Sequence, residues 1–126
     1  MNRIHTDKAP EAIGPYSQAV VANGLVWTSG QIALVPSLGQ LAEGGIVEQT
    51  TQVMENLKAV LEAACSSLDL VIKTTCFLAD MKDFAVFNEI YARYITGKPG
   101  RSCVAVKELP KGALVEVEVI AELKQQ

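Results

Sequence analysis

The sequence of 126 residues has little of what metal, disulfide and nucleic-acid sites are built from. It contains one histidine, His5, and three cysteines, Cys65, Cys76 and Cys103, which are odd in number and form no C-x-x-C pair. This composition supports neither a disulfide framework nor a structural zinc site. The 11 lysines and arginines are scattered and the net charge is −3. We therefore do not expect a nucleic-acid partner, because phosphate contacts need a concentrated basic face.

Long apolar runs are also lacking. No stretch approaches the roughly 20 residues that span a bilayer, and residues 1–10 mix charge with proline where a signal peptide would be continuously apolar. We therefore expect a cytoplasmic protein with no membrane partner. The length leaves room for one domain, residues 1–126. Apolar residues make up 49% of the chain and charged residues only 20%, which indicates extra surface to bury.

The apolar patterns predict five strands and two helices. Asn23-Gly24 tolerates the positive φ angles of a type I′ turn, which predicts a hairpin between residues 16–22 and 25–30. Apolar positions at helical spacing predict an amphipathic helix over residues 47–64. The following elements complete the prediction: a central strand at 68–79, a second helix from Asp80 or Asp83 to Tyr94, and strands at 101–109 and 114–123 joined by a turn at 110–112.

This order suits an α+β sandwich in which two helices cover one face of a mixed sheet. The last strand alternates, and its valines at positions 115, 117 and 119 should meet the helices. We expect Val104 and Val106 to share that side. The opposite face should then hold Arg101, Cys103, Glu116 and Glu118, together with apolar residues. Because monomers rarely leave a large apolar sheet face in water, we expect other subunits to cover it.

Glu116 needs a partner if another subunit buries it, and Arg101 is the cation expected on the same face. A hairpin turning at residues 110–113 places Glu116 opposite about residue 107, roughly 20 Å along the strand from Arg101. The two side chains could then meet only across a subunit boundary. There they would form either a pocket for a small carboxylate or a structural salt bridge.

The same register arithmetic groups polar residues near the end of the first hairpin. Tyr16 falls across from Gln31 and Gln18 across from Ser29, next to Gly30. The Tyr16 and Ser29 hydroxyls and the exposed backbone N–H groups at Gly30 could orient a small anion, although an ordinary strand end is the simpler interpretation.

Two more residues have a functional and a structural interpretation. Cys103 could be a nucleophile, but with no histidine besides His5 to activate it, a core or interface thiol is the simpler interpretation. Asn88 could donate to a ligand or lie on a solvated helix surface.

Several short segments, taken together, resemble a known family. They are Ala9-Pro10, residues 12–18 (AIGPYSQ), 28–31 (TSGQ), 88–91 (NEIY), 101–104 (RSCV), 109–111 (LPK) and 115–118 (VEVE). In this order they resemble the RidA (YjgF) family of reactive-intermediate deaminases over nearly the whole chain. The resemblance implies a homotrimer of chorismate-mutase-like α+β subunits, with active sites in the clefts between neighbours.

The resemblance also implies an activity and a set of site residues. RidA proteins hydrolyse 2-imino acids, such as 2-iminopropanoate and 2-iminobutanoate, to 2-oxo acids and ammonia without a metal or cofactor. By similarity, Arg101 would bind the substrate carboxylate, Glu116 would activate water, and Cys103 would contact the imine nitrogen through its backbone. Tyr16, Ser29, Gly30 and Asn88 would line the cleft.

Two other functions stay open. A small-carboxylate-binding regulatory protein would use Arg101 without catalysis. An endoribonuclease that inhibits translation is also suggested for this family, but the acidic charge balance speaks against it.

Overall fold

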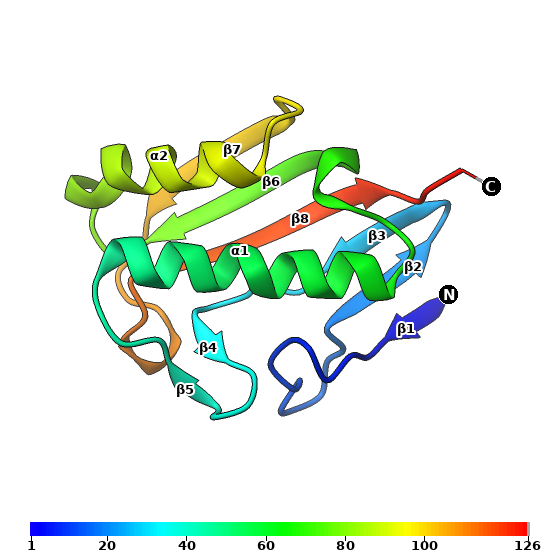
Figure 1. Ribbon diagram of the computed structural model, residues 1–126, viewed down its shortest axis with the longest axis horizontal. Helices are drawn as coiled ribbons and strands as arrows, with labels where there is room; N and C mark the ends of the chain where they lie inside the picture. The colour runs from blue at the N-terminus through cyan, green and yellow to red at the C-terminus, as the bar shows by residue number, and fades with distance from the viewer. Residues whose placement is uncertain (126) are drawn as a thin grey trace.

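The computed structural model describes residues 1–125, which form a six-stranded mixed sheet with two helices on one of its faces (Figure 1). The sheet strands in spatial order are β1 (Asn2–Ile4), β2 (Ala19–Ala22), β3 (Leu25–Thr28), β8 (Val115–Glu122), β6 (Val71–Leu78) and β7 (Gly100–Ala105). The helices are α1 (Ile46–Ala63) and α2 (Phe84–Tyr94), and a small separate ribbon pairs β4 (Leu34–Val35) with β5 (Gln40–Leu41). The predicted α+β class is confirmed.

Helix α1 forms where its sequence predicts it. The Glu48 carboxylate accepts a hydrogen bond of 2.8 Å from the Gly45 backbone N–H and so satisfies a donor at the helix start. The fully buried side chains of α1 recur at helical spacing and face the sheet: Val53, Met54, Leu57, Val60 and Leu61. This stripe anchors α1 across β8 and β3.

The predicted hairpin is also confirmed. Asn23 and Gly24 adopt φ angles of 54° and 74°, both in the left-handed region that a type I′ turn requires, and Ala22 pairs with Leu25. The regular pairing ends at Thr28 in β3, earlier than predicted, so the chain beyond it is free to form a loop.

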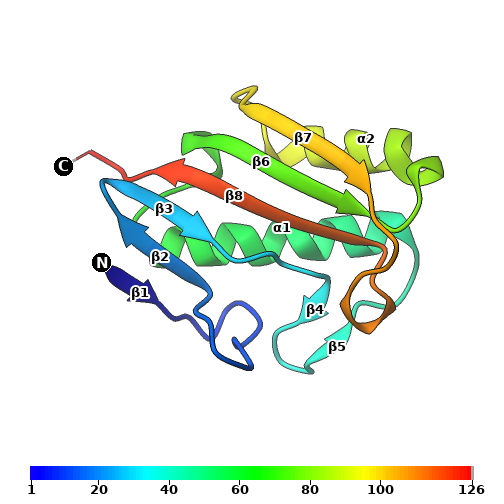
Figure 2. The ribbon, with the colours of Figure 1, turned by 180° about the vertical axis from the view of Figure 1, so that it is seen from behind.

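The predicted hairpin between the last two strands is wrong. Strand β6 lies between β7 and β8, parallel to β7 and antiparallel to β8 (Figure 2). The 110–112 segment forms a short 3₁₀ turn, Pro110–Gly112, with Lys111 at a φ of 58°, on the path that takes the chain past β6. The central position predicted for the β-branched strand is confirmed.

The order of the strands also corrects the predicted faces. Arg101 and Cys103 lie in register with Thr74 and Cys76, which are buried on the helix side, so both point toward the helices. The prediction that they share a face with the glutamates is therefore wrong. Val104, which was predicted to meet the helices, lies in register with Phe77 on the other face.

The face turned away from the helices, which we call the open face, carries Glu116 and Glu118 as predicted. It also carries apolar side chains: Trp27, Phe77, Val104 and Ile120. Trp27 is 41% exposed and Val104 48% exposed. In Figure 2 the whole sheet lies in front of the helices, so neither helix covers this face. Across residues 1–125, no helix is both long and apolar enough to cross a membrane.

Candidate active site

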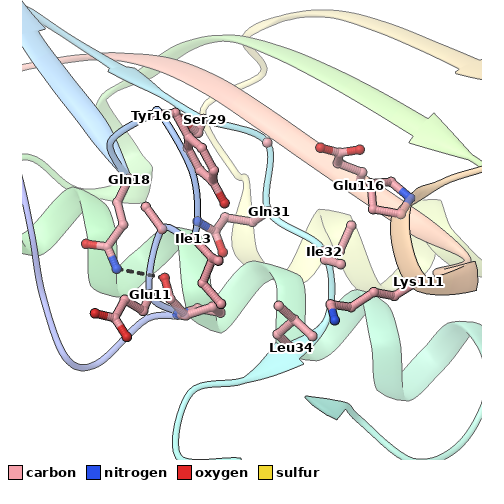
Figure 3. A pocket seen from close by; sticks show the side chains of 14 residues that line it. Glu11, Ile13, Tyr16, Gln18, Ser29, Gln31, Ile32, Leu34, Lys111 and Glu116 are labelled. Atoms are coloured by element: carbon pink, nitrogen blue, oxygen red, sulfur yellow. Dashed lines mark hydrogen bonds between the residues drawn. The ribbon is translucent and has the colours of Figure 1, made fainter. Parts of the chain in front are cut away.

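A pocket of about 390 Å³ opens where the chain leaves the β2–β3 hairpin (Figure 3). Three residues that the resemblance places in the lining of the cleft contribute to it, Tyr16, Ser29 and Gly30, together with Glu116, to which the resemblance gives the activation of water. Its apolar wall includes Ile13, Ile32 and Leu34, and Lys111 borders it. The pocket therefore combines two carboxylates, those of Glu11 and Glu116, two hydroxyls and one amine with apolar surface. We call Tyr16, Ser29, Gly30 and Glu116 the acidic half-site.

Backbone hydrogen bonds bring Gly30 beside β8. The Ser29 N–H donates to the Gln18 carbonyl at 2.9 Å, and Gln31 exchanges two bonds of 2.9 and 3.1 Å with Val117. Gly30 therefore lies next to Glu116, and a Cβ atom at position 30 would collide with the Glu116 carboxylate. Glycine allows this close approach, because the carboxylate occupies the space that a side chain at position 30 would fill.

The Glu116 carboxylate is in an unfavourable place for a charge. Burial raises its pKa, and the negative charge of Glu118 raises it further. In the described chain, the ion pairs join His5 to Asp7 and Lys82 to Asp80, so no cation neutralises Glu116 within its own subunit. A half-buried carboxylate with a raised pKa and no hydrogen-bonded partner is suited to accept a proton.

Gln18 holds the other wall of the pocket, a role that its sequence position did not indicate. Its side chain is 1% exposed. It accepts a hydrogen bond from the Thr6 N–H at 2.7 Å and donates to the carbonyls of Thr6 and Pro10 at 3.0 and 2.8 Å. These contacts fix the segment that runs into Ile13. The sequence places Gln18 at a strand end and in the family-like segment 12–18, and indicates no role of its own for it.

Lys111 is a second pocket residue to which the sequence assigns no role, although it lies in the predicted turn and in the family-like segment 109–111. It borders the acidic half-site in Figure 3.

Arg101 lies in a second group of residues at the free edge of the sheet. Its Nη1 donates to Asn88 Oδ1 at 2.6 Å, and both residues line a separate pocket of about 570 Å³ beside α2. The Arg101 side chain is exposed, and no strand in the described part of the chain pairs with the outer edge of β7. We call Arg101, Asn88 and Cys103 the arginine half-site.

Cys103 has the environment of a structural thiol. It is half-buried beside Cys76, and burial raises its pKa, so the reactive thiolate is disfavoured. Its backbone has a different environment. The Val106 N–H donates to the Leu78 carbonyl on β6, and alternate residues of a strand point their backbone groups to opposite sides. The backbone N–H and C=O of Cys103 therefore face the free edge of β7.

A single subunit does not bring the two half-sites together. Glu116 on β8 pairs with Phe77 on β6, and Phe77 pairs with Val104 on β7. Arg101 lies three residues before Val104. The backbones of Glu116 and Arg101 are therefore two strand spacings and three residues apart, a distance of roughly 14 Å. The two side chains also point to opposite faces of the sheet. If they act on one ligand, they must come from different subunits.

The fold defines a small α+β protein with a pocket beside Glu116 on one sheet face and an exposed arginine at one sheet edge. The chain belongs to the family described as Endoribonuclease L-PSP, whose model matches residues 6–123. This is the RidA (YjgF) family that the sequence resembles.

Two curated relatives cover nearly the whole chain. One from Lactococcus lactis, AldR, named as a candidate regulator, is 51% identical over 98% of this chain and 99% of its own. The other, from Mus musculus, is named 2-iminobutanoate/2-iminopropanoate deaminase and is 50% identical over 94% of this chain and 88% of its own.

Solved structures agree with the fold. A crystal structure from Thermotoga maritima, described as a candidate endoribonuclease, has a TM-score of 0.96 and 48% identity, and the match covers 99% of both chains. The structure of E. coli TdcF with bound serine has a TM-score of 0.93 and 40% identity, and it covers 98% of this chain and 100% of that one.

Proposed function

We propose that the protein hydrolyses 2-imino acids, such as 2-iminopropanoate and 2-iminobutanoate, to 2-oxo acids and ammonia. The observation that carries the proposal is the placement of two unpaired charges. Glu116 lies against Gly30 in a small pocket, and Arg101 stands at a free sheet edge. Each active site would combine the acidic half-site of one subunit with the arginine half-site of a neighbour. The deaminase name of the mouse relative supports this function.

The proposed reaction needs one positioned base and one carboxylate anchor. Arg101 binds the substrate carboxylate, and Glu116 takes a proton from a water molecule that attacks the imine carbon. Glu116 gives this proton to the nitrogen as the C=N double bond becomes a single bond, which yields a carbinolamine. Glu116 then takes the proton of the carbinolamine hydroxyl and passes it to the nitrogen. The C=O double bond forms as the C–N bond breaks, and the products are ammonia and the 2-oxo acid. The imine carbon is already electrophilic, so orientation and one proton carrier suffice.

The remaining site residues are proposed to orient the substrate. The Cys103 backbone groups at the free edge would contact the imine nitrogen. The Ser29 hydroxyl donates to the Ser17 carbonyl, which leaves its oxygen lone pairs to accept a bond from the nitrogen or the water. Tyr16 presents a half-exposed ring at the pocket mouth. Asn88 would hold Arg101 in place.

We propose a homotrimer, as in the family the chain belongs to, with its open faces directed inward. The exposed Trp27 and Val104 side chains support burial of the open face by other copies of the chain. We also infer that the protein acts in the cytoplasm. Its three cysteines are free thiols, as a reducing compartment favours.

The test is the release of 2-oxobutanoate from 2-iminobutanoate generated by a threonine dehydratase. The wild-type protein should accelerate release over spontaneous hydrolysis. Glu116→Gln should lower kcat/KM about 100-fold or more because it removes the proton carrier, and Arg101→Ala should lower it by a similar factor because it removes the anchor. Glu122→Gln, on the same strand and face, and Arg93→Ala, on α2, are the matched controls and should keep wild-type activity. No acceleration by the wild-type protein would contradict the proposal.

Thermal melting separates loss of catalysis from loss of folding. The pKa of Glu116 is higher in the folded chain than in the unfolded chain. The stability that this group contributes is therefore present at low pH and is lost as pH rises through the folded pKa. At neutral pH, Glu116→Gln should melt no lower than the wild type.

A carboxylate-binding regulator is the second candidate, favoured by the name of the Lactococcus relative and by the serine bound to TdcF. It predicts ligand binding that depends on Arg101 and a Glu116→Gln variant that acts normally. Binding without any accelerated hydrolysis would favour it. The family description also names an endoribonuclease. RNA cleavage that persists through purification and disappears in Arg101→Ala would favour that activity.

A further inference from the structure

Arg101 lies against three residues of α2 that share one helix face. Phe84, Asn88 and Tyr91 are four and then three positions apart, the spacing that places side chains along one stripe. The Arg101 Cζ lies 5.5 Å from the centroid of the Phe84 ring and 5.0 Å from that of the Tyr91 ring. Both distances are within the range of cation–π contacts, so the two rings support the guanidinium.

The Tyr91 ring is itself fixed from below. Its hydroxyl lies 2.9 Å from the Thr74 hydroxyl, in a hydrogen bond that either group can donate. Thr74 is fully buried and Tyr91 is 8% exposed. The Phe87 ring packs at a tilt against Tyr91, with 5.5 Å between centroids. A small change at the Thr74 hydroxyl would therefore be transmitted to the ring under Arg101.

The pairing of β6 with β7 connects the two ends of this series of contacts. Thr74 on β6 is the direct partner of Arg101 on β7. The same threonine holds Tyr91, and Tyr91 supports the guanidinium of the arginine whose backbone lies beside that threonine. The position of the guanidinium is thus fixed relative to the sheet edge from which it extends.

The N–H donors of Arg101 that remain free indicate what the guanidinium can bind. Asn88 occupies Nη1, which leaves donors on Nε and Nη2. Along residues 1–125 no ion pair involves Arg101, so its charge has no partner in its own subunit. An exposed arginine normally loses much rotamer freedom when it binds a carboxylate, and a guanidinium that is already fixed loses less.

We propose that Tyr91, held by the buried Thr74 hydroxyl, is a positioning residue that fixes the Arg101 guanidinium for a small carboxylate. This inference rests on the proposed function, in which Arg101 binds the carboxylate of the substrate. Tyr91 acts through Arg101 and touches no reacting atom. Because the carboxylate contact persists from bound substrate to transition state, weakening it raises KM and leaves kcat nearly unchanged.

The experiment compares Tyr91→Leu, which removes the ring, with Thr74→Val and Tyr91→Phe, which remove one hydroxyl each and keep the side-chain volume. Binding of 2-oxobutanoate is measured by calorimetry, and kcat and KM are measured with 2-iminobutanoate. Tyr91→Leu should raise Kd and KM about tenfold with kcat within about twofold, and each hydroxyl variant should raise both about threefold. Tyr94→Leu, one turn further along α2 and away from Arg101, is the control and should leave Kd unchanged.

Several outcomes would overturn the inference. These are an unchanged Kd in Thr74→Val and Tyr91→Phe, an equal effect of Tyr94→Leu, a kcat that falls as far as KM rises, or a wild-type protein that binds no 2-oxobutanoate. The hydroxyl variants keep the test valid if Tyr91→Leu fails to fold. Calorimetry needs no catalysis, so a wild-type protein that binds 2-oxobutanoate without hydrolysing the imine contradicts the proposed function and leaves the positioning role to be judged by the variants.

Discussion

At the scale of single residues, the most informative side chain is Glu116. The fold leaves it half-buried against the Gly30 backbone, and among residues 1–125 no cation forms a salt bridge with it. A carboxylate placed only for stability would have a partner or would point into water. Both its neighbours and its raised pKa therefore indicate a functional role.

Its neighbour Glu118 provides a pH test of that role. If Glu116 acts as a base, kcat/KM should rise with pH as this carboxyl group ionises. Glu118→Gln removes a negative charge that raises the pKa of Glu116, so the acid limb of the pH profile should move to lower pH. The measurement is kcat/KM against pH, with Glu122→Gln as the variant that should not move the limb. A limb that stays in place or moves to higher pH in Glu118→Gln would show that another group controls it.

The buried Gln18 side chain, just before β2, holds the N-terminal segment in place. Gln18→Leu removes the hydrogen bonds to Thr6 and Pro10 and leaves their backbone groups without partners. We expect a loss of about 2 to 3 kcal/mol in the free energy of unfolding. We also expect a higher KM, because the segment lines the acidic half-site.

Urea unfolding followed by circular dichroism checks this expectation. The control is Gln52→Leu on α1, whose side chain is less buried and donates one bond, to Asn56. It should change the free energy of unfolding by less than about 1 kcal/mol. Equal stability of Gln18→Leu and the wild type would mean that the N-terminal wall is held by other contacts.

At the scale of elements, local signals in the sequence predict well and long-range pairing does not follow from them. Asn23-Gly24 specifies its own turn, and the apolar stripe of α1 specifies both the helix and its buried face. The proline, lysine and glycine at 110–112 indicate a turn as well, but a turn does not say which strand lies beside which. The β-α-β order of β6, α2 and β7 favours a parallel pair, and that pairing puts β6 between the last two strands.

The edge position of β7 explains the error in the predicted faces. Central strands show their buried face through alternation, as Val115, Val117 and Val119 do on β8. The burial pattern of β7 shows no such alternation, so the apolar Val104 does not indicate which face of β7 is turned toward the helices. The register with Thr74 and Cys76 decides which face of the sheet each β7 side chain points to, and this register is known only from the folded structure.

The sequence selected candidate site residues, and it carried little information about how they are arranged. Family resemblance selected Tyr16, Ser29, Gly30 and Glu116, and the fold gathers these four in one pocket. It selected Arg101 and Asn88 as well, and these two share a hydrogen bond elsewhere. That the two groups lie on opposite faces of the sheet could not be read from motifs.

At the scale of the whole molecule, the account depends on assembly. One subunit presents an acid on its open face and a cation at its sheet edge, and these cannot reach each other within the chain. In a homotrimer every interface could combine the two, so three identical incomplete subunits would make three complete sites.

Mixing two inactive variants tests this central claim most directly. Arg101→Ala subunits keep Glu116, and Glu116→Gln subunits keep Arg101. In trimers formed by co-refolding equal amounts, an interface with both native residues arises by chance in about one case in four. The deaminase assay should therefore recover about a quarter of wild-type activity from two nearly inactive parents. Mixed trimers, verified by differential tagging, that remain as inactive as the parents would contradict a site shared between subunits.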